Sequence, residues 1–132
     1  EMSAHHYFRD FAYCDSGMVP WLLVTGLMLQ HDKGLAGLVD QRMLKFPASG
    51  EINRRLDDPE KAIAAIQARY QAQALSIDDT DGLSMEFDQW RFNLRMSNTE
   101  PVIRLNVESR GDASLMTMQT DTLLNMVGGE EA

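Results

Sequence analysis

One short polar segment carries the side chains in this sequence that are best suited to chemistry. It runs from Arg95 to Pro101 and reads Arg-Met-Ser-Asn-Thr-Glu-Pro. Arg95 can present two parallel N–H donors to an anion, while Ser97 and Thr99 add hydroxyl donors. Asn98 adds an amide donor and tolerates left-handed backbone, and the N–H groups of such a loop can converge on an anion. The segment is therefore a candidate phosphate-binding loop that needs no metal.

The same residue types are also common in plain turns. Serine, asparagine, threonine and proline each favour turns for local reasons, and an arginine beside a turn is ordinary. From the local pattern alone, a phosphate-binding loop and a simple turn both remain open.

A second polar cluster stands at the beginning of the chain. Glu1, Ser3 and His5 alternate, so an extended backbone would direct all three side chains the same way. A carboxylate, a hydroxyl and an imidazole on one face could bind sugar hydroxyls, although solvated side chains at a chain end would read the same. The pair His5 and His6 does not predict a metal site, because neighbouring strand residues point to opposite faces and no cysteine or further histidine is suitably spaced.

Composition limits the class of protein. The chain has 132 residues, 44% of them hydrophobic, which suits one domain with a real core, or one domain plus part of another. The net charge is -8 and no basic cluster occurs, so we expect neither a nucleic-acid partner nor binding to an anionic membrane surface. The longest apolar run, from Met18 to Leu29, is too short and interrupted to span a bilayer.

Cysteine usage suits a reducing compartment. Cys14 is the only cysteine, so no internal disulfide can form, and no signal-peptide pattern is present. We therefore expect a cytoplasmic location. Cys14 is read as a small buried core residue rather than a nucleophile.

The chain divides into two predicted parts, residues 1–46 and 47–132, joined at Phe46–Gly50, where proline and glycine interrupt helices. The first part predicts a short strand at 5–8, a helix from Ser16 as its N-cap to about Gln30, and a second helix at about 35–45. The first helix is mostly apolar and should be buried on most sides, and most of the apolar stripe of the second helix should face the core.

The second part predicts strands and helices in one layered unit. Strands with one wet face are expected at 83–87, 90–95 and 103–108, the first two joined as a hairpin by Asp88 and Gln89. A further strand is expected at 51–56, and 79–82 is a turn. Two helices should cover the sheet, one beginning at Asp58 and the other at Asp112, the second ending at Gly128.

Two of these segments resemble motifs of the alpha-D-phosphohexomutase superfamily. The stretch Glu-Met-Ser-Ala-His at 1–5 is similar to its sugar-recognition loop, usually Gly-Glu-Met-Ser-Gly-His. The leading glycine is missing and Ala4 replaces the second one. Residues 95–101 look like the C-terminal phosphate-binding loop of the superfamily, and the longer run 79–110 is especially similar to bacterial phosphomannomutases and phosphoglucomutases.

The resemblance implies an α+β fold. Residues 47–132 would be a C-terminal domain with an antiparallel sheet covered by two helices, and residues 1–46 a helical remnant of the third domain. The phosphoserine loop and the Asp-rich magnesium loop of the four-domain enzymes lie earlier in their chains, and neither motif occurs here, so no catalytic or metal-binding residue is expected. Sugar contacts would come from Glu1, Ser3 and His5, and contacts to the phosphate that is not transferred from Arg95, Ser97, Asn98 and Thr99.

The activity implied is that of a phosphomannomutase, an isomerase acting as an intramolecular phosphotransferase. It would interconvert mannose 6-phosphate and mannose 1-phosphate through a phosphoserine and a hexose 1,6-bisphosphate, with Mg²⁺ bound elsewhere in the full-length enzyme. The partners of this chain would be the phosphosugar and the missing N-terminal domains, and it would be inactive alone. A stand-alone anion-binding or regulatory module and a structural dimerisation domain stay open as alternatives, as does the choice between mannose and glucose phosphates.

Overall fold

The structure is a computed structural model that describes residues 5–97 and 100–132. It contains two compact units, Glu1–Gln41 and Arg42–Ala132, which are described separately here. Helix α2 (Leu35–Lys45) contains residues of both units.

The first unit is built on a short hairpin and a long helix. Strand β1 (Tyr7–Phe8) pairs antiparallel with β2 (Cys14–Asp15), and the 3-10 turn η1 (Arg9–Phe11) connects them. The strand predicted at 5–8 is therefore only two residues long. Helix α1 (Met18–His31) follows, and the Ser16 hydroxyl accepts a hydrogen bond from the backbone N–H of Val19 at 3.3 Å. The predicted N-cap role of Ser16 is confirmed.

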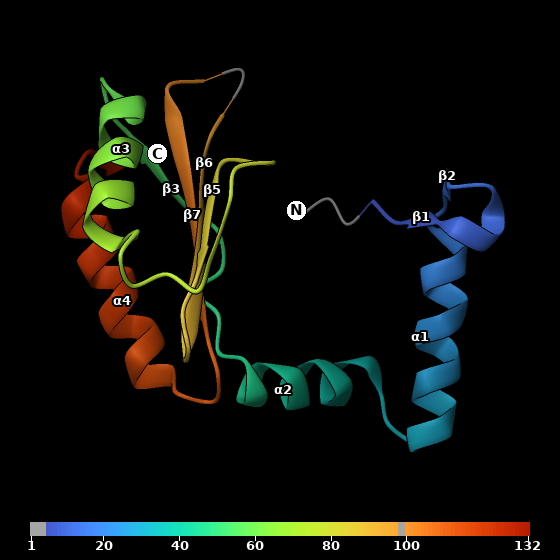
Figure 1. Ribbon diagram of the computed structural model, residues 1–132. Helices are drawn as coiled ribbons and strands as arrows, with labels where there is room; N and C mark the ends of the chain where they lie inside the picture. The colour runs from blue at the N-terminus through green and yellow to red at the C-terminus, as the bar shows by residue number, and fades with distance from the viewer. Residues whose placement is uncertain (1–4, 98–99) are drawn as a thin grey trace. The chain divides into compact units, whose positions relative to one another are not determined.

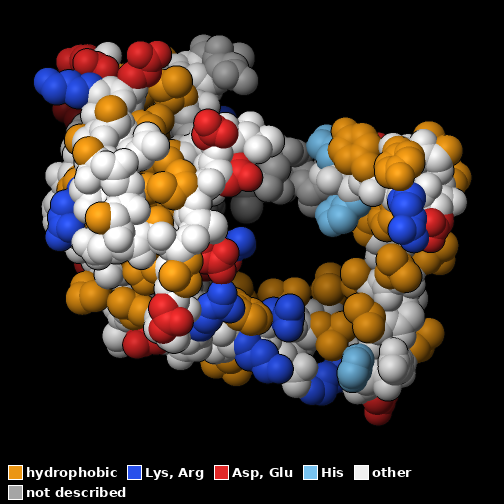
Figure 2. Space-filling model, viewed as in Figure 1, with side chains coloured by type: hydrophobic (Ala, Val, Ile, Leu, Met, Phe, Trp, Pro, Cys, Tyr) orange, Lys and Arg blue, Asp and Glu red, His pale blue; other side chains and the backbone are white. Residues whose placement is uncertain are grey.

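The predicted burial of the first unit is wrong for this chain. Trp21 is 59% exposed and Val39 48%, and none of the residues of α1 is buried. Figure 2 shows hydrophobic side chains gathered over α1. In the described part of this unit the sheet has two residues in each strand, too few to cover a helix of 14 residues. Cys14 is exposed as well, contrary to the expectation of a core residue.

The described residues include no helix with both the length and the apolar character needed to cross a membrane.

The second unit is an antiparallel sheet with two helices. Its strand order is β4-β5-β6-β7-β3-β8, and every neighbouring pair is antiparallel. Two short exposed edge strands, β4 and β8, were not predicted. The bounds are β3 (Ile52–Arg55), α3 (Pro59–Tyr70), β4 (Ser76–Asp78), β5 (Leu83–Glu86), β6 (Trp90–Met96), β7 (Val102–Ser109), α4 (Ala113–Val127) and β8 (Glu130–Glu131).

The core lies between the sheet and the helices α3 and α4, which cover one face of it (Figure 1). Alternate residues of β5, β6 and β7 are buried there, as the period of two in the sequence predicted. Ile66 of α3 and Leu123 of α4 are both 0% exposed and belong to the same cluster. The expected α+β fold, an antiparallel sheet covered by two helices, is confirmed.

Capping explains where these helices begin and end. The Asp58 carboxylate accepts from the N–H of Lys61 at 3.0 Å, and that of Asp112 from Leu115 at 2.8 Å. Gly128, with φ 67°, terminates α4. All three boundaries agree with the sequence prediction.

Candidate functional site

The face of the sheet opposite the helices is polar, because every second residue of its strands points away from the core. It presents arginine, asparagine, serine and carboxylate side chains from four neighbouring strands. They are Asn53 of β3, Ser84 and Glu86 of β5, Arg91, Asn93 and Arg95 of β6, and Arg104, Asn106 and Glu108 of β7.

Arg95 lies near the end of β6 and is held between two carboxylates. Its side chain is 18% exposed. One terminal nitrogen, Nη2, lies 3.5 Å from Oε2 of Glu51, and Nη1 lies 4.0 Å from Oδ2 of Asp81. A charge-assisted hydrogen bond of this type is about 2.7–2.9 Å long. The guanidinium is therefore attracted by both carboxylates without a short bond to either.

Arg104 faces Arg95 directly across the β6–β7 ladder. Like charges at opposing positions destabilise a sheet, so an anion is needed near the pair. Glu51 supplies it: its Oε1 lies 3.9 Å from Nε of Arg104, while its Oε2 is the atom near Arg95. Oε2 of Glu51 and Nε of Arg104 are buried, and neither has a hydrogen-bond partner among the described residues. The side chains of Glu51, Arg95 and Arg104 therefore form one group of charges held at distances of 3.5–3.9 Å, called the Glu51 cluster.

The turn after β4 brings Asp81 to this cluster. The Asn93 side-chain amide donates to the carbonyl of Asp81 at 2.8 Å and to the hydroxyl of Ser84 at 2.9 Å. The Asp78 carboxylate accepts from the N–H of Thr80 at 2.8 Å, and this hydrogen bond lowers the pKa of Asp78. These bonds fix the turn, so the position of Asp81 beside Arg95 is set by the sheet itself.

Strand β6 ends at Met96, one residue after Arg95, and the rest of the predicted phosphate-binding loop leaves the sheet there. The N–H of Ser97 donates to the carbonyl of Val102 at 2.8 Å, which closes the base of the β6–β7 connection. Ser97 is thus placed two residues from Arg95 at the start of the loop. Asn98 and Thr99 lie outside the described residues, and the binding role of all four residues stays a prediction.

The predicted sugar-binding group belongs to the other unit. His5 is exposed, and its Nδ1 lies 2.5 Å from Oδ2 of Asp15. Oδ1 of the same carboxylate accepts from the N–H of His6 at 3.2 Å. The hydrogen bond to His5 lowers the pKa of Asp15 most, with smaller contributions from the charge of His5 and from backbone N–H groups. Glu1 and Ser3 lie outside the described residues.

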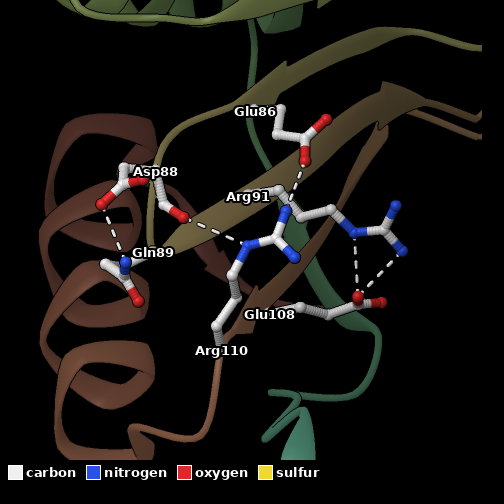
Figure 3. A network of polar contacts seen from close by, with 6 residues as sticks. All are labelled: Glu86, Asp88, Gln89, Arg91, Glu108 and Arg110. Atoms are coloured by element: carbon white, nitrogen blue, oxygen red, sulfur yellow. Dashed lines mark hydrogen bonds and ion pairs between the residues drawn. The ribbon is translucent and has the colours of Figure 1, made fainter.

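A second arginine cluster occupies the opposite end of the polar face (Figure 3). Arg91 and Glu108 approach to 2.8 Å, as do Arg110 and Glu86, and Nε of Arg110 also donates to the carbonyl of Asp88 at 3.1 Å. The two ion pairs have the length of charge-assisted hydrogen bonds, and the bond from Arg110 to Asp88 ties the β5–β6 turn to the end of β7. Here the guanidinium groups are satisfied by protein, in contrast to Arg95.

Residues around this second cluster line a pocket of about 360 Å³. Arg42 and Phe46 form another side of it, with the guanidinium of Arg42 5.2 Å from the ring centre of Phe46. The charges of Arg91 and Arg110 in this pocket are already compensated by Glu108 and Glu86.

Sequence reasoning missed four residues of these sites: Glu51, Asp81, Arg104 and Asp15. A signal existed for Arg104, because alternation placed it on the wet face next to the strand of Arg95. Nothing in the sequence indicates that β3 lies beside β7, and that pairing is what delivers Glu51 to both arginines.

Two family models match the chain. The model described as "Phosphoglucomutase/phosphomannomutase, C-terminal domain" matches residues 51–124, and "Phosphoglucomutase/phosphomannomutase, alpha/beta/alpha domain III" matches residues 1–46. The C-terminal-domain match alone covers more than half of the chain and includes the Glu51 cluster.

Curated relatives are similar over nearly all of the chain. A "Phosphomannomutase" of Escherichia coli (strain K12) is 62% identical over 127 residues, which are 96% of this chain and 28% of the relative. Its namesake in Salmonella typhimurium is 63% identical over the same shares. "Phosphohexose mutases" of Xanthomonas campestris pv. campestris is 57% identical over 98% of this chain and 29% of the relative. The chain thus spans somewhat more than a quarter of the length of these relatives.

A crystal structure of a phosphoglucomutase/phosphomannomutase family protein from Burkholderia thailandensis is also similar. It is 26% identical, with a TM-score of 0.47, over 64% of this chain and 19% of that one. On the strength of the family-model matches, the chain belongs to the phosphoglucomutase/phosphomannomutase family.

Proposed function

We propose that this chain is the C-terminal part of a phosphomannomutase that interconverts mannose 6-phosphate and mannose 1-phosphate. Residues 47–132 would be the phosphate-binding domain and residues 1–46 the end of the third domain. The phosphoserine and the hexose 1,6-bisphosphate would belong to chemistry in the rest of the protein, and this chain alone would be inactive. The names of the relatives and the share of their length that it spans support this assignment.

The observation that best supports phosphate binding is the partial burial of Arg95 and its lack of a short bond to a carboxylate. Its guanidinium is mostly covered, lies at the base of a loop rich in hydroxyl and amide donors, and has no carboxylate closer than 3.5 Å. Two phosphate oxygens can approach a guanidinium to about 2.8 Å and accept two parallel hydrogen bonds from it. The ligand would therefore replace two long contacts with a short bidentate one, assisted by Ser97, Asn98 and Thr99.

The sugar role would fall to Glu1, Ser3 and His5. The carboxylate of Asp15 favours a proton on Nδ1 of His5, so in the neutral ring Nε2 is the acceptor nitrogen. An acceptor of this kind suits a sugar hydroxyl. Asp15 would act as the residue that orients His5, in the way that carboxylates orient imidazoles at other sites.

The resemblance implies Mg²⁺ held by residues elsewhere in the full-length enzyme. Within residues 5–97 and 100–132, no group of three or more histidine, cysteine or acidic side chains could hold a metal ion. Positioning and electrostatic stabilisation contribute most to phosphoryl transfer, and this chain would contribute by gripping whichever phosphate is not reacting.

The test is the substitution Arg95→Ala in the full-length enzyme. Loss of one charge-assisted contact to phosphate costs about 1.5–3 kcal/mol, so kcat/KM should fall by about 10- to 150-fold. Arg91→Ala is the matched control, because Arg91 is on the same strand and face but pairs with Glu108. Its kcat/KM should stay within about threefold of wild type. Equal effects of the two substitutions, or none from Arg95→Ala, would contradict the assignment.

A further inference from the structure

Glu51 has two cationic neighbours and a short bond to neither. Its carboxylate oxygens lie 3.5 Å from Arg95 and 3.9 Å from Arg104, and its side chain is 20% exposed. A carboxylate this covered is costly to leave without a partner. Because two arginines lie near one carboxylate, either arginine can move away from Glu51 while the other still compensates its negative charge.

The position of Glu51 is fixed by the backbone. Ser49, two residues earlier, donates its N–H to the carbonyl of Val107 at 2.9 Å, and its hydroxyl accepts from the N–H of Val107 at 2.9 Å. Strand β3 continues from Ile52 in register with Leu105. The backbone of Glu51 therefore lies between two anchored points, which keep its carboxylate within reach of both arginines.

We propose that Glu51 is a positioning residue that competes with the ligand's phosphate for Arg95, and that Arg104 is the partner Glu51 keeps when Arg95 is taken. This rests on the proposed phosphate-binding function. When no phosphate is bound, Glu51 attracts the guanidinium of Arg95 and keeps it near its binding position. When phosphate is bound, the negative charge of Glu51 repels it. The carboxylate thus weakens phosphate binding and speeds release, which matters for an enzyme that must release one phosphate and grip the other.

A purely structural ion pair predicts the opposite result. If Glu51 only orders Arg95, neutralising it disorders the guanidinium and weakens phosphate binding. If it competes, neutralising it removes a nearby negative charge and tightens binding. The sign of the change in affinity therefore distinguishes the two roles.

The experiment titrates the 132-residue chain with inorganic phosphate at low ionic strength, where screening is weak. Affinities come from backbone amide shifts in NMR spectra. Glu51→Gln should bind phosphate about three- to tenfold more tightly than wild type, the range for one partly buried ion pair. Glu108→Gln is the matched control: Glu108 lies on the same face of the sheet but pairs with Arg91, so the affinity should change less than about twofold.

Arg104→Gln gives an independent test. Without Arg104, Glu51 must keep Arg95, so phosphate binding should weaken by about three- to tenfold. The double variant Glu51→Gln with Arg104→Gln should regain at least wild-type affinity. If Arg104 instead bound phosphate directly, the loss would persist in the double variant, and the proposal would fall. Should Glu51→Gln not fold, wild-type or tighter binding by Arg104→Gln still overturns the proposal.

Kinetics of the full-length enzyme provide the second readout. Glu51→Gln should lower KM and kcat together, since slower release accompanies tighter binding. A higher KM would show a structural role. Wild-type binding that is lost in Arg95→Ala but not tightened in Glu51→Gln overturns only the competition. If phosphate causes no amide shifts in the wild-type chain, both the competition and the proposed function are overturned.

Discussion

Gly82 lies directly against Arg95. A Cβ placed on Gly82 would be 2.5 Å from Cβ of Arg95 and 2.7 Å from the carbonyl oxygen of Leu94. Gly82 also has φ +76°, a conformation that side chains rarely adopt. The turn that carries Asp81 can approach Arg95 only because residue 82 has no side chain.

The substitution Gly82→Ala should therefore destabilise the second unit and displace Arg95. We expect the free energy of unfolding to fall by about 3 kcal/mol, from left-handed backbone and steric overlap together. Gly50→Ala is the control, since Gly50 has φ +70° but nothing within 4 Å of a built Cβ. It should cost about 1–2 kcal/mol. Urea unfolding of both variants measures the difference, and equal losses would show that the contact with Arg95 is not tight.

The helix face assigned to the core can be tested on α4. Leu123 is 0% exposed and Met118 is 54% exposed, although both lie on the same helix. Leu123→Ala should lower the free energy of unfolding by about 2–5 kcal/mol, because it leaves a cavity between helix and sheet. Met118→Ala should change it by no more than about 0.5 kcal/mol. Chemical denaturation measures both, and a reversed order would mean that α4 presents a different face to the sheet.

The pair His5 and Asp15 predicts a pH-dependent contribution to the first unit. The pKa of Asp15 is lowered from 3.8, chiefly by its hydrogen bond with His5, so ionised Asp15 favours the folded state. This contribution is present above the ordinary pKa of the carboxyl group and is lost as the pH falls through the lowered one.

Carboxyl NMR titration of His5→Ala provides the check. The pKa of Asp15 should rise toward 3.8 in the variant, because its largest cause of lowering is removed. The pKa of Asp78 should stay low, since its lowering comes from hydrogen bonds with Thr80 in the other unit. An unchanged pKa of Asp15 would mean that the imidazole does not bind this carboxylate.

Local patterns predicted most of the second unit. Alternation along β5, β6 and β7 encodes which face is buried, and Asp58 and Asp112 are caps whose effect is confined to one helical turn. Such features depend on residues that are close in sequence, so they can be predicted without a structure. The short strand β4 was not predicted because it has only three residues, all of them exposed. So short a strand shows no clear alternation of buried and exposed side chains.

Long-range features could not be predicted in the same way. The Glu51 cluster depends on β3 lying beside β7, although Glu51 and Arg104 are far apart in sequence. The exposure of α1 also escaped prediction, because an apolar helix normally has a surface to pack on and the described part of its unit offers only a short hairpin. The likeness of residues 95–101 to a known loop predicts a phosphate-binding role for Arg95, but it does not predict the carboxylates that surround Arg95.

Mapping where inorganic phosphate binds on the wild-type chain is the most direct test of the proposed role of Arg95. Backbone amide shifts in NMR spectra should concentrate at residues 95–102 and at the 79–82 turn, and they should vanish in Arg95→Ala. The arginines of the second cluster, Arg91 and Arg110, provide an internal comparison because carboxylates already satisfy them. Shifts centred on that cluster, or shifts at 95–102 that survive Arg95→Ala, would contradict the claim that Arg95 is the phosphate-binding residue.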